Sequence, residues 1–256
     1  MKLIFLCVLA TVTCALALSG CGGSSSSSYA PPATSAQGVK VRIADGAPVL
    51  EALINGVPED IGAAYLQVDG STVISSFAYG GLSPFLNMSA GVHSLRALDE
   101  LGYSVGPLKT TSLSPGGRYT LILVGSYPNY QVLTFEEPAS AKGTQLSLYE
   151  ASPSVPKAAF GSFRASSYSD LRQLGSAAFG NVATVNLGAS VSNFGGFAAA
   201  TSCPKPSPPN CLTLAQIDAF DSHNVLPFHS ATRLSLFLFD PKAGSGGGPV
   251  FGSLDK

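Results

Sequence analysis

Two stretches of the sequence carry side chains of the types that catalysis uses. Residues 102–106, Gly-Tyr-Ser-Val-Gly, have the G-x-S-x-G spacing that holds a serine nucleophile on a sharp turn between a strand and a helix. Pro107 follows at once and residues 109–111 favour an extended chain, so the pattern does not predict the required helix. We therefore interpret Ser104 as a turn residue, and a hydrolase is the lesser alternative.

His223 and His229 belong to the second stretch, with Asp218 and Asp221 just before them. Imidazole and carboxylate side chains bind metal ions, and with a serine they form the Ser-His-Asp arrangement of hydrolases. Pro227 lies between the two histidines and prevents them from sharing one face of a regular helix. The sequence therefore predicts no catalytic residue, no metal site and no cofactor.

Other polar and aromatic residues have structural explanations beside functional ones. His93 lies on the apolar face of an expected strand, which favours a half-buried, hydrogen-bonded histidine. Asp45 and Glu150 precede prolines at matching places, and loop capping explains them, with calcium or ligand binding as the alternative. Three tyrosines could stack on sugar rings or belong to ordinary loop ends. They are Tyr103, Tyr127 and Tyr130.

The first residues have the pattern of a secretory signal. Lys2 precedes the apolar run at 3–10, which is too short to span a membrane comfortably. Residues 18–21, Leu-Ser-Gly-Cys, resemble the lipobox of bacterial lipoproteins. The resemblance implies cleavage before Cys21 and lipid on its thiol, and two or more acyl chains hold a protein stably at a membrane. The alternatives are an ordinary signal peptide and an uncleaved anchor helix.

A flexible tether is expected after the lipidated cysteine. Residues 22–38 are rich in Gly, Ser and Pro and have too little apolar surface to fold, so they should reach roughly 20 Å. Residue 22 is Gly rather than Asp, which by resemblance to Gram-negative sorting favours the outer membrane. The expected partner of this segment is therefore a membrane, reached through the lipid on Cys21.

The remaining cysteines agree with an oxidising compartment. Cys7 and Cys14 would leave with the signal peptide, and Cys203 and Cys211 remain as one possible pair. Residues 204–210 between them offer no usual metal ligand, which excludes zinc and leaves a disulfide or two free buried thiols. A disulfide closing so short a loop adds about 2–3 kcal/mol, and less here because proline already restricts the unfolded loop.

The composition excludes one class of partner and favours one class of fold. Removal of Lys2 with the signal peptide would leave 13 of the 14 basic residues against 15 acidic ones, with no basic stripe, so nucleic acid is not an expected partner. Charged residues make up 11% of the chain, where about a quarter is usual. With 28 glycines and 18 prolines as well, the chain favours β-structure with many turns.

Strand signals run through the chain from residue 39. Residues 118–125 and 233–239 are apolar on both alternating faces, as in the inner strands of a sandwich. A helix is expected over residues 213–220. Tight turns are expected at 69–70, 90–91 and 115–117. Shorter strands are expected at 39–43, 65–68, 92–98, 131–135, 145–149 and 182–187.

Three blocks recur in the same order about 100 residues apart, which indicates a diverged duplication. Each copy would suffice for a sandwich domain. Two unrelated runs of apolar alternation are the alternative. The blocks are 41–48 with 146–153, 78–80 with 178–180, and 118–123 with 233–238.

The first copy also resembles a known family. Its motifs are an early V-R with a later proline, V-D-G at 68–70, A-Y-G at 78–80, S-P-F-L at 83–86, A-G at 90–91 and G-x-R-Y-T-L-I-L-V-G at 116–125. Together they resemble domain-of-unknown-function 4397 over residues 39–135. The resemblance implies a secreted or lipid-anchored bacterial protein of β-sandwich repeats, and it implies no reaction. The later copy matches only in outline.

We expect an all-β protein of two tandem immunoglobulin-like β-sandwich domains after a signal peptide and a flexible tether. The predicted segments are the signal peptide at 1–20, the lipidated cysteine and tether at 21–38, a first sandwich at 39–138 and a second, diverged sandwich at 143–256. The expected role is a non-enzymatic structural or protein-interaction module of the bacterial envelope. Binding of a glycan or cell-wall polymer is the alternative.

Overall fold

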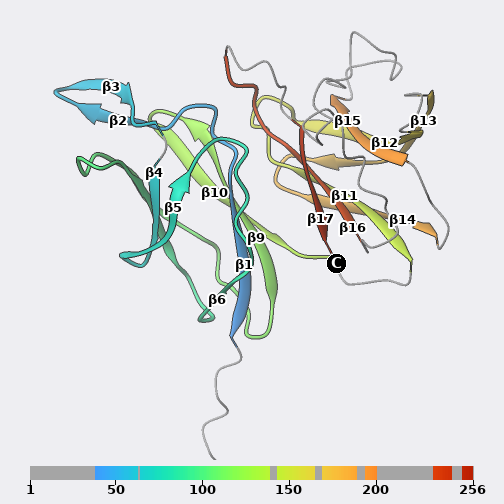
Figure 1. Cartoon of the computed structure of the whole chain (residues 1–256), viewed down its shortest axis with the longest axis horizontal. Helices are drawn as coiled ribbons and strands as arrows, with labels where there is room; N and C mark the ends of the chain where they lie inside the picture. Colours follow the sequence, from blue (N-terminus) through green and yellow to red (C-terminus); the bar gives the residue numbers. More distant parts are fainter. Residues whose placement is uncertain are drawn as a thin grey trace, which may run out of the picture. The chain divides into compact units, whose positions relative to one another are not determined.

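The computed structural model describes residues 38–62, 64–138, 143–164, 169–188, 194–200, 233–243 and 250–255. Every regular element within these ranges is a β-strand (Figure 1), and the strands belong to one compact unit. The predicted all-β fold of sandwich domains is therefore confirmed, while its immunoglobulin-like detail stays a prediction. The expected signal peptide and the expected helix over 213–220 lie outside the described residues.

The first half of the chain forms two four-stranded sheets and a small hairpin. One sheet has the strand order β10-β9-β1-β6 and the other β5-β4-β7-β8, and β2 pairs with β3. In the first sheet, β1 runs parallel to β9, which is a central strand as predicted. The strands are β1 (Val39–Asp45), β2 (Glu51–Ile54), β3 (Val57–Asp60), β4 (Ala64–Val68), β5 (Ser71–Phe77), β6 (Leu86–Met88), β7 (Ser94–Leu98), β8 (Ser104–Lys109), β9 (Arg118–Ser126) and β10 (Asn129–Glu136).

The second half repeats this plan with fewer described strands. One sheet has the order β14-β11-β16-β17 and the other β13-β12-β15, and β11 runs parallel to the central β16. The strands are β11 (Thr144–Glu150), β12 (Lys157–Arg164), β13 (Ser169–Ala178), β14 (Val182–Gly188), β15 (Phe194–Ala200), β16 (Arg233–Leu238) and β17 (Val250–Asp255).

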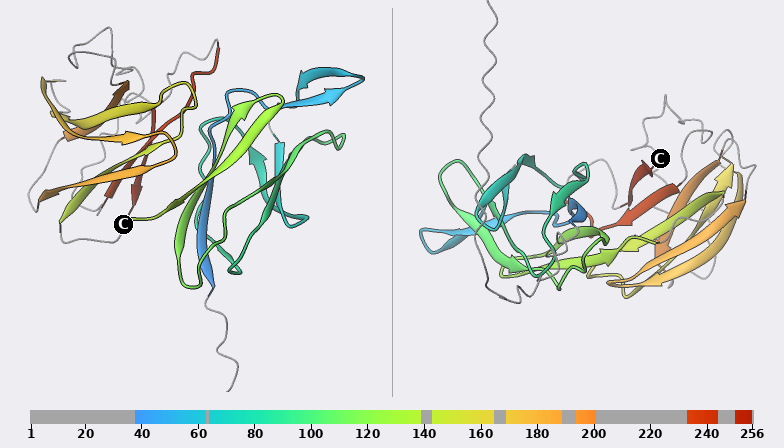
Figure 2. Two further views of the ribbon diagram at one scale, coloured as in Figure 1. Left: turned by 180° about the vertical axis from the view of Figure 1, so that it is seen from behind. Right: turned by 90° about the horizontal axis from the view of Figure 1, so that it is seen from below.

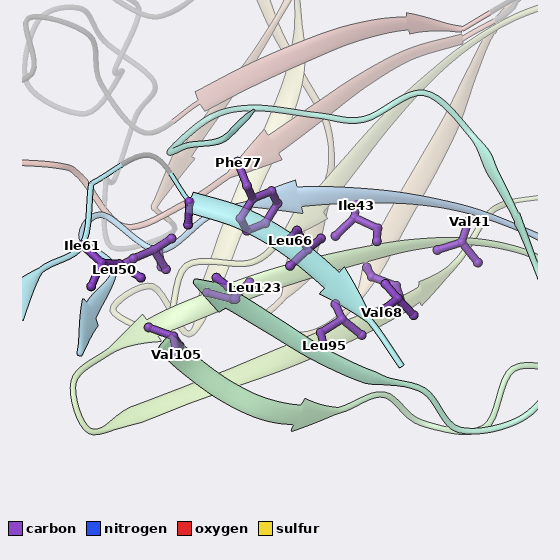
Figure 3. Close-up of a cluster of buried hydrophobic side chains, with 14 of the residues drawn as sticks. Val41, Ile43, Leu50, Ile61, Leu66, Val68, Phe77, Leu95, Val105 and Leu123 are labelled. Atoms are coloured by element: carbon purple, nitrogen blue, oxygen red, sulfur yellow. The ribbon is translucent and has the colours of Figure 1, made fainter. Parts of the chain in front are cut away.

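Three clusters of buried side chains hold the sheets together. The first lies between the two sheets of the first sandwich and includes Ile43, Leu66 and Leu123 (Figure 3). The second has the same place in the second sandwich. The third lies between the sheets that contain β1 and β11, where the rings of Tyr149 and Phe237 stack with centroids 4.7 Å apart. The strands β9 and β16 are thus covered on both faces, which explains their continuous apolar sequences.

The repeated blocks have equivalent strand pairings in the two halves. Val41 of β1 pairs with Tyr119 of β9, and at the same register Leu146 of β11 pairs with Leu234 of β16. Both pairs of strands are parallel, although the length of chain between β1 and β9 differs from the length between β11 and β16. This shared register is what a diverged duplication with altered loop lengths predicts.

The turns next to these strands repeat the same hydrogen bonds. Gly80 donates its backbone N–H to the carbonyl of Asp45 at 2.8 Å, and Gly180 donates to the carbonyl of Glu150 at 2.8 Å. Gly80 and Gly180 have φ angles of 78° and 77°, which a residue with a side chain rarely adopts. The repeat therefore preserves backbone geometry as well as apolar pattern.

A buried group of charged side chains joins the two inner sheets. Glu137 follows β10, and its side chain is 2% exposed. Its carboxylate accepts hydrogen bonds from Arg42 of β1 at 3.1 Å, from Arg233 of β16 at 3.0 Å and from the Tyr149 hydroxyl of β11 at 2.8 Å. Arg42 also donates to Asp255 of β17 at 2.8 Å. The two arginines are thus balanced by two carboxylates.

Burial and pairing act in opposite directions on Arg42. Burial alone would lower the pKa of its guanidinium, but the charges of Glu137 and Asp255 outweigh that effect and raise the pKa above its ordinary value. The rings of Phe237 and Tyr149 also face the guanidinium, with centroids 5.3 and 5.7 Å from its central carbon. Because each buried charge depends on its partners, loss of one leaves the others uncompensated.

We predict that Glu137→Gln lowers the free energy of unfolding by about 3–5 kcal/mol, because two buried arginines would then share one carboxylate. Urea unfolding followed by circular dichroism measures the change. The matched control is Glu136→Gln, an exposed neighbour on β10, for which we expect a change within about 0.5 kcal/mol. Equal losses in both variants would contradict the assigned role of Glu137.

Candidate binding surface

A short hairpin projects from the first sandwich, as Figures 1 and 2 show. Its strands β2 and β3 are joined by Asn55 and Gly56, whose φ angles of 51° and 85° suit the two-residue turn of a twisted hairpin. Leu53 and Val57, beside this turn, are 56% and 55% exposed. Two such apolar side chains on one projecting ribbon indicate a contact surface.

The base of the hairpin is fixed to the sandwich. The Tyr130 hydroxyl donates to the carbonyl of Val49 at 3.0 Å and accepts from the backbone N–H of Glu51 at 2.8 Å. Ile61 donates its N–H to the carbonyl of Leu50 at 2.8 Å and closes the hairpin. Hydrogen bonds therefore fix both strands at the base of the hairpin, so the position of its apolar tip relative to the sandwich is well defined.

An open groove of about 700 Å³ lies on the outer sheet of the first sandwich. Tyr65, Thr72 and Ser75 line it together with residues 98–102. The Tyr65 hydroxyl lies 3.5 Å from Oε1 of Glu100, at the limit of a hydrogen bond. The groove thus combines an aromatic ring with hydroxyl and carboxylate groups.

Ser104 is not placed as a nucleophile. It is the first residue of β8, where it pairs with Leu98 of β7, and β8 continues to Lys109 as a strand. The nucleophile elbow requires a serine between a strand and a helix. The predicted turn position is one residue off, since the turn ends at Tyr103, and the elbow geometry is not formed.

His93 is hydrogen-bonded, as the sequence predicts, but it is buried rather than half-buried. Its Nδ1 lies 2.6 Å from a carboxylate oxygen of Asp69, and its Nε2 lies 2.9 Å from the carbonyl of Ser89. The Asp69 carboxylate also accepts the backbone N–H of Ser94, and these contacts lower the pKa of Asp69. Both ring nitrogens of His93 are therefore engaged in holding loops together.

Asp45 and Glu150 cap their loops at equivalent places in the two halves. The Asp45 carboxylate accepts the N–H of Ala47 at 3.0 Å, and the Glu150 carboxylate accepts the N–H of Ser152 at 3.0 Å. The capping interpretation is therefore confirmed. Burial raises the pKa of Asp45 to about 7 and that of Glu150 to about 8, the latter aided by the charge of Asp240.

The three candidate sugar-stacking tyrosines do not form one exposed surface. Tyr130 fixes the hairpin, and both it and Tyr103 pack against the first core. Tyr127 lies in the turn between β9 and β10. The aromatic ring that lines the groove is instead Tyr65.

Several predicted sites lie outside the described residues. The lipidation at Cys21 and the disulfide between Cys203 and Cys211 therefore stay predictions. Across the described ranges, no three His, Cys, Asp or Glu side chains come close enough to hold a metal ion, and no helix is long and apolar enough to cross a membrane. The remaining undescribed candidates are Asp218, Asp221, His223 and His229.

A comparison with protein families gives one match. The model of "Domain of unknown function (DUF4397)" matches residues 49–159. These residues, which make up less than half of the chain, are similar to the DUF4397 family. A comparison with curated proteins finds no similar sequence. The suspected family is thus confirmed for this part of the chain.

The DUF4397 match is shifted along the chain relative to the predicted resemblance over 39–135. It begins after β1 and ends in β12, so it omits the first inner strand and includes β11, the equivalent strand of the second half. Because β1 and β11 have the same pairing partners in their own halves, the match spans about one repeat that begins at a different strand. The hairpin and the groove both lie within it.

The two buried capping carboxyls predict how stability depends on pH. Their pKa values are raised in the folded protein, so between about pH 4 and pH 8 the folded state binds more protons than the unfolded state, and stability falls as pH rises. We predict that Asp45→Asn with Glu150→Gln stabilises the protein more at pH 8.5 than at pH 5.

Urea unfolding at the two pH values measures this difference. The amides keep the oxygen that accepts each loop N–H, and the exposed Glu59→Gln is the control. Equal effects of the double variant at both pH values would show that these carboxyls do not titrate as assigned.

Proposed function

We propose that this protein is a lipid-anchored bacterial envelope protein whose first sandwich binds another envelope protein. The observation that carries the proposal is the projecting β2–β3 hairpin, with Leu53 and Val57 more than half exposed on a fixed base. β1 begins at Val39, and the hairpin follows the far end of this strand (Figure 1). A tether that ends before Val39 would therefore join the sandwich away from the hairpin.

The lipid anchor is the second part of the proposal. The Leu-Ser-Gly-Cys motif at 18–21 and the polar tether after it support an exported, acylated protein of the outer membrane. An oxidising envelope would also allow the bond between Cys203 and Cys211. The DUF4397 match supports a domain class and no reaction, so the proposed role is non-enzymatic.

The groove beside Tyr65 supports a second candidate function, the binding of a glycan or cell-wall polymer. An aromatic ring stacks on the apolar face of a sugar, while hydroxyl and carboxylate groups bind its hydroxyls. Tyr65, Thr72 and Glu100 provide these groups. We rank this candidate second because the groove is open, whereas ligand sites generally enclose most of a small ligand.

Photo-crosslinking in intact bacteria tests the protein-interaction role. A photoreactive amino acid at position 53 of the full chain should give discrete adducts of higher mass, because Leu53 is 56% exposed and lies on the proposed contact surface. The control is position 92, since Val92 is 56% exposed and lies just before the start of β7, outside the hairpin. The same adducts from both positions, or none from position 53, would refute a specific contact at the hairpin.

Membrane fractionation with intact-mass measurement tests the anchor. The natural protein should partition with membranes and carry the mass of acyl chains, and Cys21→Ala should be soluble and unacylated, since acyl chains supply the membrane affinity. A mass gain on reduction checks the Cys203–Cys211 bond. An unmodified, soluble natural protein would exclude lipid anchoring while leaving the protein-interaction role open.

A further inference from the structure

The outward face of the β2–β3 hairpin combines apolar and acidic side chains. Leu53 pairs with Pro58 across the two strands, and Glu51 pairs with Asp60. Because successive side chains of a strand alternate between faces, these four share one face. Ala52, on the opposite face, is buried in the first core. The face that carries Leu53 therefore points away from the sandwich.

Among the described residues, the acidic side chains on this hairpin have no cation paired with them. Residues 43–95 contain no Lys or Arg, and within the described ranges Glu51, Glu59 and Asp60 make no ion pair. Carboxylates directly opposite each other across a hairpin repel. Asp60 accepts the backbone N–H of Gly62 at 2.7 Å, a local contact that an Asn would also make. Neither this contact nor pairing within the hairpin requires a second carboxylate opposite Asp60, whereas recognition of a cationic partner gives both charges a role.

Side chains rather than the strand edge form the recognition surface. In a hairpin with a two-residue turn, Ile54 and Val57 exchange backbone hydrogen bonds and the next pair, Leu53 and Pro58, does not. The nitrogen of Pro58 therefore faces the open edge of β3, where it has no N–H to donate. A partner strand added to this edge would lose a hydrogen bond, so strand addition is disfavoured.

We propose that the outward face of the hairpin docks a basic segment of a partner protein, in which Lys or Arg side chains flank an aliphatic or aromatic residue. The cations meet Glu51 and Asp60, and the apolar residue covers Leu53. Because Tyr130 already fixes the base of the hairpin, little ordering is needed on binding. This inference rests on the proposed function, since it names the partner chemistry of the same surface.

Fluorescence anisotropy with defined peptides tests the docking. The protein is the full chain with Cys21→Ala, and the probe is a labelled synthetic peptide of alternating Lys and Leu, beside a matched peptide of alternating Glu and Leu. We expect the Lys peptide to bind more tightly and to lose affinity as salt rises. Leu53→Ser should weaken its binding about tenfold, through lost apolar contact. Glu51→Gln with Asp60→Asn should weaken it similarly and remove most of the salt dependence.

The matched control is Val92→Ser, which removes an equally exposed apolar side chain elsewhere on the first sandwich. It should leave the affinity unchanged, and urea unfolding confirms that each variant is folded. An equal loss with Val92→Ser, or no loss with the hairpin variants, overturns the proposal. If position 53 crosslinks a partner in cells but the Lys peptide does not bind, the basic partner is wrong and the protein-interaction role stands. If neither occurs, both fail.

Discussion

The carboxylate of Glu137 is the point on which the arrangement of the two sandwiches depends. It lies between Arg42 of β1 and Arg233 of β16, so one buried charge holds an inner strand of each half. Buried ion pairs add little net stability compared with apolar packing, but they fix relative positions because an incomplete group is costly. The surrounding aromatic cluster supplies the apolar contact between the inner sheets. Apolar packing therefore holds the two inner sheets together, and the charged group sets their relative position.

The packing of the two halves against each other leaves the outer sheet of the first half and the β2–β3 hairpin open to solvent. Each half has an inner sheet, with β1 or β11, and the third apolar cluster covers the inner sheets on the faces that would otherwise meet water. The outer sheet of the first half packs on one side only, so its other side carries the groove, and the hairpin belongs to neither sheet. The parts proposed to bind are thus those that the packing of the inner sheets leaves uncovered.

The sequence predicted the strands with the most regular apolar patterns and missed others, some of them buried. Among the missed strands, β12 and β15 carry the buried Phe160 and Phe197, but their many Ala and Gly residues give a weak strand signal. β9 and β16 are apolar throughout, and β1, β4, β7, β10, β11 and β14 follow alternation, so pattern alone found them. β5 is mostly exposed and polar, and its pairing with β4 decides its conformation. The β2–β3 hairpin was missed although Asn55-Gly56 between short apolar runs is a strong hairpin signal. The role of Arg42 could not be predicted, because its partners Glu137 and Asp255 are 95 and 213 residues away in the chain.

The carboxylates of this protein divide according to how each is compensated. Glu137 is buried and forms ion pairs with two arginines, whereas Asp45 and Glu150 are buried without an arginine partner. One oxygen of Glu150 has no hydrogen bond within the described residues. Burial favours the neutral form of these two carboxyls, so their burial is made tolerable by a bound proton rather than by an ion pair. Glu51 and Asp60 of the hairpin are not fully buried and make no ion pair within the described ranges, although Asp60 accepts the backbone N–H of Gly62. Among these carboxylates, the hairpin pair is therefore the one for which a partner protein is proposed to supply the opposite charge.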